Sequence, residues 1–427
     1  MRLRIRPRFD GEGPHELRWL FGAVLLVRLL YPFFNSPLDH LFSDPARHWA
    51  NGNNFLHPDA IGSGDPYLYQ VWLFLLQRAT QQSAPGILLG CGLLCALMPY
   101  GWYRALRELI PRQWALAGAV LIGLMPSFMG IYGFFMNETL LLTLTGFAFW
   151  LTLRAHRKRT VGAFICACIV WLAACFTRIV VWPVAILCLL WLVAIPPSRW
   201  FKFLLGAGLF VLIAVPAGLH GRENLGYFSP FGNLYLNTLY RQSGKKTIEL
   251  DFGPKGRYWF GSPSFYNPTF YPFSDWTTDR DGTVSAIIDT DKGRADWERE
   301  GRRVRQQRTF PSWLDFRENL LYLGFGQPWP DNDRATLVGW LTVWMRWLWP
   351  CVALGVLIGV ARRQFRGRDW LLPVCGLTIY ALLAIQQQGI MEGRFRKPID
   401  PILLAAMVVL VYRTSINIDG RRDSKTS

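Results

Sequence analysis

Long blocks of apolar residues constrain this 427-residue chain more than any other feature. About 20 apolar residues in a helix are enough to cross the ~30 Å hydrocarbon core of a membrane. Ten blocks qualify as candidate spans, several of them only 15–18 residues long: 17–34, 84–106, 114–133, 138–154, 161–176, 179–196, 202–218, 338–361, 370–386 and 398–412. The sequence therefore predicts an all-α polytopic membrane protein with about ten transmembrane helices.

The composition agrees with a membrane protein and excludes other classes. Charged residues make up 18% of the chain, below the roughly 25% of an average soluble domain. The 51% hydrophobic content excludes intrinsic disorder, and the 20 tryptophans suit membrane interfaces. We expect no cleavable signal peptide, because the basic start is long and no small-residue cleavage site follows the first apolar block.

The distribution of Lys and Arg predicts the orientation. The two termini and the loops near 107–113, 154–160, 197–202 and 362–369 hold 22 of the 46 basic residues, whereas the short loops of the opposite side hold six. The positive-inside rule then places both termini in the cytoplasm, as in a multi-pass protein of the bacterial inner membrane. Topology and contact with anionic lipids explain the net charge of +17, so no nucleic-acid partner is expected.

Three regions follow from this topology. Residues 1–218 form a module of seven helices with an external loop at 35–83, and residues 338–427 form a module of three helices with a cytoplasmic tail. Between them, 219–337 is expected to be a mixed extracytoplasmic domain with a solvated helix in 289–310. Its aromatic run at 257–276 fits either a carbohydrate-stacking wall or a belt at the lipid headgroups. All eight cysteines fall inside predicted spans, so we expect no external disulfides.

Ionisable residues gather near the outer ends of the predicted spans, where they are candidates for function. Asp44 follows the first span and precedes Pro45, so it is either a functional acid or the N-cap of a helix at 45–55. Glu138 opens the fourth span, where the helix dipole favours an acid in any protein. Arg178 lies in the turn between the fifth and sixth spans. Arg28, within the first span, either snorkels outward or lies beneath a carboxylate site.

A basic cluster precedes the last span. Arg394, Arg396 and Lys397 stand on the side where short loops otherwise carry little positive charge, with Glu392 beside them. Anchoring alone explains such a cluster poorly, because it opposes the topology rule. Carboxylates and several arginines on one face suit a reaction that needs a base and a stabilised anionic leaving group. Lipid phosphate is the natural anion at this depth.

These residues resemble the GT-C glycosyltransferases, which take a sugar from a polyprenyl-phosphate carrier on the outer side of a membrane. That family includes protein O-mannosyltransferases and the bacterial aminoarabinose transferase of lipid A. The likeness covers the seven N-terminal spans and the last loop, but not 219–337. The matching features are Arg28 with FSDPARHW, Glu138 in MNETL, the TR…P motif at Thr177, Arg178 and Pro183, and Glu392, Arg394, Phe395, Arg396, Pro398 and Pro401 in the pattern E-x-R-[YF]-R-x-P-x-x-P. Family members often have a second acid beside the first, where this chain has Pro45.

The resemblance implies an inverting transfer. Asp44 would be the general base on an acceptor hydroxyl of a glycan, lipid or protein, and Arg394 and Arg396 would bind the departing phosphate. Glu138 would support a sugar hydroxyl or a divalent metal such as Mg²⁺ or Mn²⁺, with Asp44 as the other ligand. The resemblance leaves open whether a metal is needed.

Two other classes of function remain. A lipid-linked oligosaccharide polymerase or ligase would use paired arginines and would not need Asp44. A transporter is disfavoured, because the halves show no internal symmetry and the polar residues cap the outer ends rather than lie at midplane. The histidines of the first loop match no zinc spacing.

Overall fold

The computed structural model describes residues 15–57, 65–196, 198–232, 247–253, 257–261, 283–307, 345–386 and 399–423, and single positions at 239, 316, 320, 323, 341 and 397. Helices predominate in this part of the chain, as the apolar blocks predicted. One occupies each of the ten predicted ranges: α1 (His15–Phe34), α4 (Ala84–Arg107), α5 (Arg112–Leu124), α7 (Asn137–Lys158), α8 (Val161–Thr177), α9 (Trp182–Val193), α10 (Arg199–Leu225), α15 (Leu348–Ala361), α16 (Leu371–Gln386) and α17 (Asp400–Asp423).

Four helical segments are both long and apolar enough to cross a membrane: His15–Asp39, Ala84–Arg107, Arg199–Glu223 and Gly367–Ile385. A fifth candidate is a bent pair, in which α5 meets the short helix α6 (Pro126–Gly130) and the 3₁₀ turn η3 (Ile131–Gly133) at an angle of 63°. The coarse prediction of a helical membrane protein is confirmed. The count of ten spans stays a prediction.

The helix predicted over 114–133 is broken rather than continuous. Pro126 forces Met125 into an extended conformation, with φ −64° and ψ 117°, and so ends α5 at Leu124. Other boundaries differ less. The predicted span 179–196 opens with the 3₁₀ turn η4 (Ile179–Val181), and α10 and α17 run on beyond their apolar blocks to Leu225 and Asp423.

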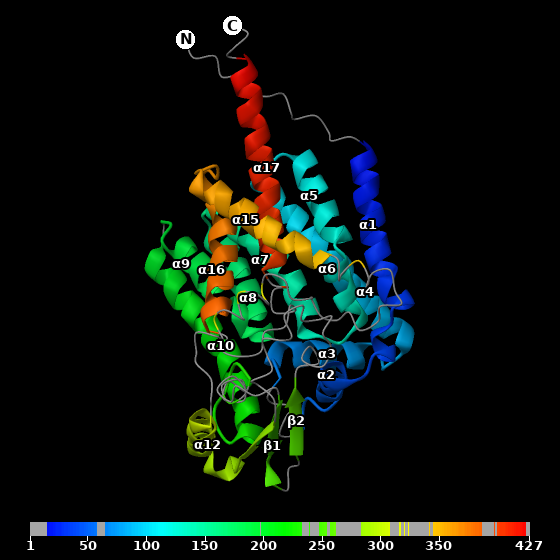
Figure 1. Ribbon diagram of the computed structural model, residues 1–427, viewed down its shortest axis with the longest axis vertical. Helices are drawn as coiled ribbons and strands as arrows, with labels where there is room; N and C mark the ends of the chain where they lie inside the picture. The colour runs from blue at the N-terminus through cyan, green and yellow to red at the C-terminus, as the bar shows by residue number, and fades with distance from the viewer. Residues whose placement is uncertain are drawn as a thin grey trace.

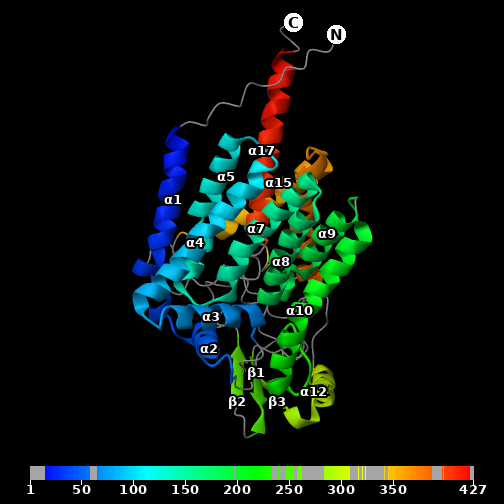
Figure 2. The same cartoon turned by 180° about the vertical axis from the view of Figure 1, so that it is seen from behind.

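The start of α1 and the end of α17 lie at the opposite end of the molecule from the small sheet (Figures 1 and 2). They share one end of the helix bundle. At the other end, α2 (Ser43–Asn53) and α3 (Tyr67–Ala79) lie across the bundle, roughly perpendicular to its long helices. The predicted external loop 35–83 is therefore largely helical.

Beyond α2 and α3 lies a small mixed unit. Strand β1 (Thr247–Asp251) pairs antiparallel with β2 (Arg257–Gly261) and parallel with β3 (Thr283–Ile287), which gives the order β2-β1-β3. The helix predicted within 289–310 is α12 (Arg294–Gln306), and it buries Trp297 and Val304 against the sheet residues Leu250, Val284 and Ala286. The aromatic run 257–276 lies mostly outside the described residues.

The end of helix α10 packs directly against this unit. The indole Nε1 of Trp297 donates a hydrogen bond to the carbonyl of Leu225, the last residue of α10, at 3.2 Å. Gly226 then ends the helix at φ +75°, and a Cβ there would lie 1.9 Å from the carbonyl oxygen of Thr290. Only glycine fits this junction, so the unit is fixed on the end of α10.

An ion pair closes the other end of the bundle. The buried carboxylate of Asp369 accepts hydrogen bonds from Arg413 Nε at 2.7 Å and Nη2 at 3.1 Å. Since Asp369 precedes α16 and Arg413 lies on α17, the pair fixes these two helices near the chain ends. Its bidentate geometry is the arrangement that Arg favours with a carboxylate.

The arrangement supports a labelling test of topology. Arg302 on α12 and Arg362 after α15 are exposed at opposite ends of the molecule. In cells with an intact inner membrane, we expect a membrane-impermeant maleimide to label Arg302→Cys, and to label Arg362→Cys only after permeabilisation. The unsubstituted chain, with its eight cysteines, supplies the background. The reverse pattern would place the small unit in the cytoplasm and contradict the predicted orientation.

Candidate functional site

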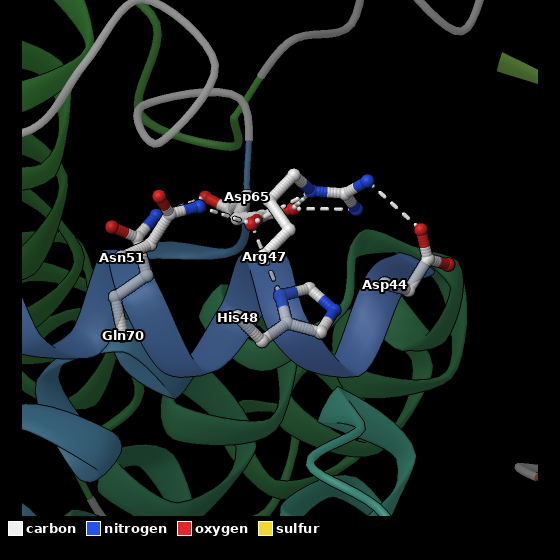
Figure 3. A network of polar contacts seen from close by, with 6 residues as sticks. All are labelled: Asp44, Arg47, His48, Asn51, Asp65 and Gln70. Carbon is white, nitrogen blue, oxygen red and sulfur yellow. Dashed lines mark hydrogen bonds and ion pairs between the residues drawn. The ribbon is translucent and has the colours of Figure 1, made fainter. Parts of the chain in front are cut away.

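Helix α2 carries a stripe of polar residues on one face. Asp44, Arg47, His48 and Asn51 are spaced three or four residues apart, so that they share one side of the helix. Arg47, His48 and Asn51 contact Asp65, which stands just before α3, and Asp44 contacts Arg47 from its other side (Figure 3). Arg47 reaches both acids: its Nε and Nη2 lie 3.2 and 3.0 Å from Asp65 Oδ1, and its Nη1 lies 2.8 Å from Asp44 Oδ1.

Asp65 is the centre of this network. Its Oδ2 accepts a hydrogen bond from Asn51 Nδ2 at 2.6 Å and lies 3.0 Å from His48 Nδ1. Burial opposes ionisation of this carboxyl, but the charges of Arg47 and His48 and their hydrogen bonds outweigh it and lower its pKa to about 2. Asp65 therefore remains a carboxylate at physiological pH.

Asp65 was not among the residues predicted from the sequence. It is one of four acids in the loop 35–83, with Asp39, Asp44 and Asp59. One signal was available: the spacing DPARHWAN places an arginine and a histidine three and four residues after Asp44, on the same helix face. A buried arginine needs hydrogen-bond acceptors, and Asp59 and Asp65 are the next acids along the chain after Asp44.

Asp44 is the accessible acid of the network. The side chain of Asp44 is 24% exposed, whereas that of Asp65 is 7% exposed. The interpretation of Asp44 as a helix N-cap is wrong, because Phe42 occupies that position and Asp44 lies within the first turn. There it benefits from the positive end of the helix dipole. The structure thus presents one carboxylate, oriented by Arg47, at the edge of a buried polar network.

Glu138 and Arg178, two of the predicted site residues, form an ion pair between Glu138 Oε1 and Arg178 Nη1. Glu138 lies in the first turn of α7, and its side chain is 1% exposed. The hydroxyl of Thr177 donates to the carbonyl of Ala173 at 2.8 Å and ends α8. Arg178 then adopts an extended conformation between α8 and η4, and Pro183 starts α9. The TR…P motif therefore turns the chain so that Arg178 meets Glu138.

Two aromatic residues, Trp49 of α2 and Tyr69 of α3, connect the polar network around Asp65 to the ion pair of Glu138 and Arg178. Trp49 of α2 stacks on Phe135, just before α7, with ring centroids 4.5 Å apart. The phenol of Tyr69 on α3 is buried and close enough to both Glu138 and Asp65 to interact with their charges. Burial raises the pKa of Tyr69 well above its usual value, and the charges of Glu138 and Asp65 raise it further. The buried phenol of Tyr69 therefore lies near both acidic sites.

Arg28 occupies neither of the positions that the sequence suggested. It is fully buried, and its Nε, Nη1 and Nη2 donate to the carbonyls of Cys95, Gly123 and Phe128 at 2.8, 2.9 and 3.0 Å. Pro99, four residues after Cys95, has no N–H for the Cys95 carbonyl, and the break at Met125 interrupts the hydrogen bonds that follow Gly123. Arg28 compensates for these backbone defects inside the bundle.

A lysine at position 28 is expected to destabilise the protein. It keeps the charge, but a single ammonium does not reach three carbonyls on three helices, and each unsatisfied carbonyl costs about 1–3 kcal/mol. We expect a clear fall in the melting temperature of the protein in lipid nanodiscs. Arg104→Lys is the control, since among the described residues the Arg104 side chain contacts only Tyr100 and Trp150, near the other end of α4. Equal melting temperatures for both variants would contradict this role of Arg28.

The C-terminal motif is only partly described. Glu392, Arg394 and Arg396 lie outside the described residues. Lys397 is 1% exposed, and its Nζ donates to the carbonyl of Ser127 in α6 at 2.6 Å. This contact holds Lys397 against the broken helix that Arg28 also contacts. The structure gives Lys397 an anchoring contact, and its predicted contact with substrate stays a prediction.

The residues suggested for a divalent metal do not fit one well. Among the residues that the structure describes, no three His, Cys, Asp or Glu side chains come together as a metal site requires. Asp44 and Glu138 each pair with an arginine, which competes with a cation for the same oxygens.

The site combines an accessible carboxylate, an arginine that orients it, and a buried Glu–Arg pair close by. This arrangement suits proton abstraction beside a position where negative charge is stabilised. No known protein-family model matches the sequence, and no curated protein matches it significantly.

Proposed function

We propose that the protein is an inverting glycosyltransferase that moves a sugar from a polyprenyl-phosphate carrier to a glycan, lipid or protein acceptor. One observation carries the proposal: Glu138 at the start of α7 pairs with Arg178 after α8, and contacts of Trp49 and Tyr69 connect this pair to the α2–α3 segment that holds Asp44. Asp44, Glu138 and Arg178 belong to the motifs that resemble the GT-C enzymes. A lipid carrier would present its phosphate to this site.

The proposal includes the orientation of the chain. About ten spans with both termini in the cytoplasm place α2, α3 and the β-sheet outside, at the bacterial inner membrane. Eight exposed apolar residues on α10 agree with a lipid-facing helix: Trp200, Phe201, Phe203, Leu204, Val211, Leu212, Val215 and Leu219. The donor would reach the site from the membrane, and the acceptor from the side of the sheet.

The reaction proceeds as one displacement. Asp44 takes the proton of the acceptor hydroxyl, and the oxygen attacks the anomeric carbon from the face opposite the phosphate. The bond between the anomeric carbon and the phosphate oxygen breaks, and its electron pair leaves with the polyprenyl phosphate. Arg394 and Arg396 would stabilise the departing phosphate, because a guanidinium fork matches phosphate oxygens. Glu138 and Arg178 would hold sugar hydroxyls close to Asp44.

Binding of the leaving lipid tests this proposal without knowledge of the sugar. We expect undecaprenyl phosphate to raise the melting temperature of the purified protein in detergent, and undecaprenol, which lacks the phosphate, to leave it unchanged. Phosphatidic acid is the control for a general response to an anionic lipid. The Arg394→Gln/Arg396→Gln double variant should lose the response to undecaprenyl phosphate. Equal responses to undecaprenol and its phosphate would contradict a phosphate site.

A further inference from the structure

We infer that Asp65 is a positioning residue for the transfer: acting through Arg47, it fixes the orientation of the base Asp44. The inference rests on the proposed function and adds to it a residue that does not touch the reacting atoms. Its basis is the order Asp65–Arg47–Asp44 along one side of α2 (Figure 3).

The geometry of the guanidinium carries the argument. Two of its nitrogens, Nε and Nη2, bind Asp65, and the third, Nη1, binds Asp44. A guanidinium is planar and rigid, so fixing two of its nitrogens also fixes the direction in which the third points. Asp65 thus determines where Arg47 presents its last donor, and hence which way the Asp44 carboxylate faces.

Asp65 is itself immobilised from several sides. Asn51 Nδ2 donates to its carboxylate at 2.6 Å, and Gln70 Nε2 donates to its main-chain oxygen at 2.9 Å. The His48 ring lies 3.0 Å from Oδ2 and packs edge-on against Tyr69. An anchor with this many contacts holds Arg47 in one orientation. A solvated carboxylate at the same position would not.

Asp65 also has a role in helix packing, and the experiment must separate this role from the orientation of Asp44. Asp65 also ties α3 to α2, so its loss affects the packing of the two helices as well as the orientation of Asp44. Gln77 offers a matched control, because its Nε2 donates to the Trp49 carbonyl at 3.0 Å. That bond joins the same two helices but touches neither Arg47 nor Asp44. Gln77→Leu therefore weakens the packing alone.

The test measures kcat, KM and melting temperature with a polyprenyl-phosphate sugar as donor. We expect Asp65→Asn to lower kcat by about tenfold or more, the value of one charge-assisted hydrogen bond, with little change in the KM for the donor. Gln77→Leu should lower the melting temperature and leave kcat close to that of the wild type. A wild-type kcat in Asp65→Asn would overturn the inference.

The double variant Asp65→Asn/Arg47→Gln keeps the test decisive if Asp65→Asn folds poorly. It removes both charges of the pair, so no arginine is left without its buried partner, and its kcat should match that of Arg47→Gln. Recovery of wild-type kcat together with stability would show a role in packing only and would overturn the inference. A wild-type enzyme that releases no polyprenyl phosphate would instead contradict the proposed function, so the two failures are distinct.

Discussion

Asp44→Asn is expected to reduce sugar transfer by about 10²–10⁴-fold, which is the contribution of a positioned general base. Asparagine has nearly the same shape and still accepts a hydrogen bond from Arg47, but it does not take a proton from an acceptor hydroxyl. The ion pair between Asp44 and Arg47 is partly exposed, and such pairs contribute about 0–1 kcal/mol to stability. The melting temperature should therefore stay close to that of the wild type while the rate of polyprenyl phosphate release collapses.

Asp39 provides the matched control for this variant. It lies five residues earlier in the same segment and is exposed, and the described residues give it no side-chain partner. Asp39→Asn removes the same charge from the same end of the molecule and should keep full activity. Full activity in Asp44→Asn as well would exclude Asp44 as the base and favour a polymerase or ligase that works with arginines alone.

Arg178→Gln is expected to be the most destabilising single change at the site. It leaves the Glu138 carboxylate, 1% exposed, without its arginine, and breaking a buried pair from one side costs about 3–5 kcal/mol. Glu138→Gln should cost less, because the Arg178 side chain is 13% exposed and retains some access to water. The double variant removes both charges and should recover much of the lost stability, as measured by thermal unfolding in nanodiscs.

The double variant also separates stability from function. If Glu138 and Arg178 bind the sugar, Glu138→Gln/Arg178→Gln stays inactive although it is folded. The pair between Glu108 and Arg157, at the opposite end of the bundle, is the control. There Glu108 is 7% exposed and Arg157 is 56% exposed, so Arg157→Gln should lower stability but leave activity unchanged. Activity that returns in the Glu138/Arg178 double variant would reduce this pair to a structural role.

The apolar blocks predicted where helices lie, because burial in a membrane or a core selects for the same long apolar runs. They did not predict where helices end. The break at Met125 depends on Pro126, a residue that transmembrane helices also tolerate as a kink, so composition alone did not distinguish the two cases. The extensions of α10 and α17 depend on tertiary contacts, Trp297 with Leu225 and Arg413 with Asp369, between residues far apart in sequence.

The candidate site was partly predictable. Asp44, Glu138 and Arg178 were expected on one face because the topology brings alternate loops together, and in the structure contacts of Trp49 and Tyr69 connect the segment of Asp44 to the Glu138–Arg178 pair. The partner of each residue was not predictable, because the pairs Arg47–Asp65 and Arg178–Glu138 span 18 and 40 positions. Arg28 shows the opposite case: the missing N–H of Pro99, four residues after Cys95, identifies an unpaired carbonyl directly in the sequence.

Release of polyprenyl phosphate tests the central claim most directly. Purified protein in proteoliposomes would receive a mixture of undecaprenyl-phosphate sugars, an extract of envelope glycolipids as acceptor and, in a parallel sample, nucleotide sugars in place of the lipid donor. If the protein is a glycosyltransferase that uses a lipid-linked donor, we expect the wild type to release undecaprenyl phosphate, Asp44→Asn to lose that release, and the nucleotide sugars not to be turned over. Transfer from nucleotide sugars, or equal release by wild type and Asp44→Asn, would contradict that function.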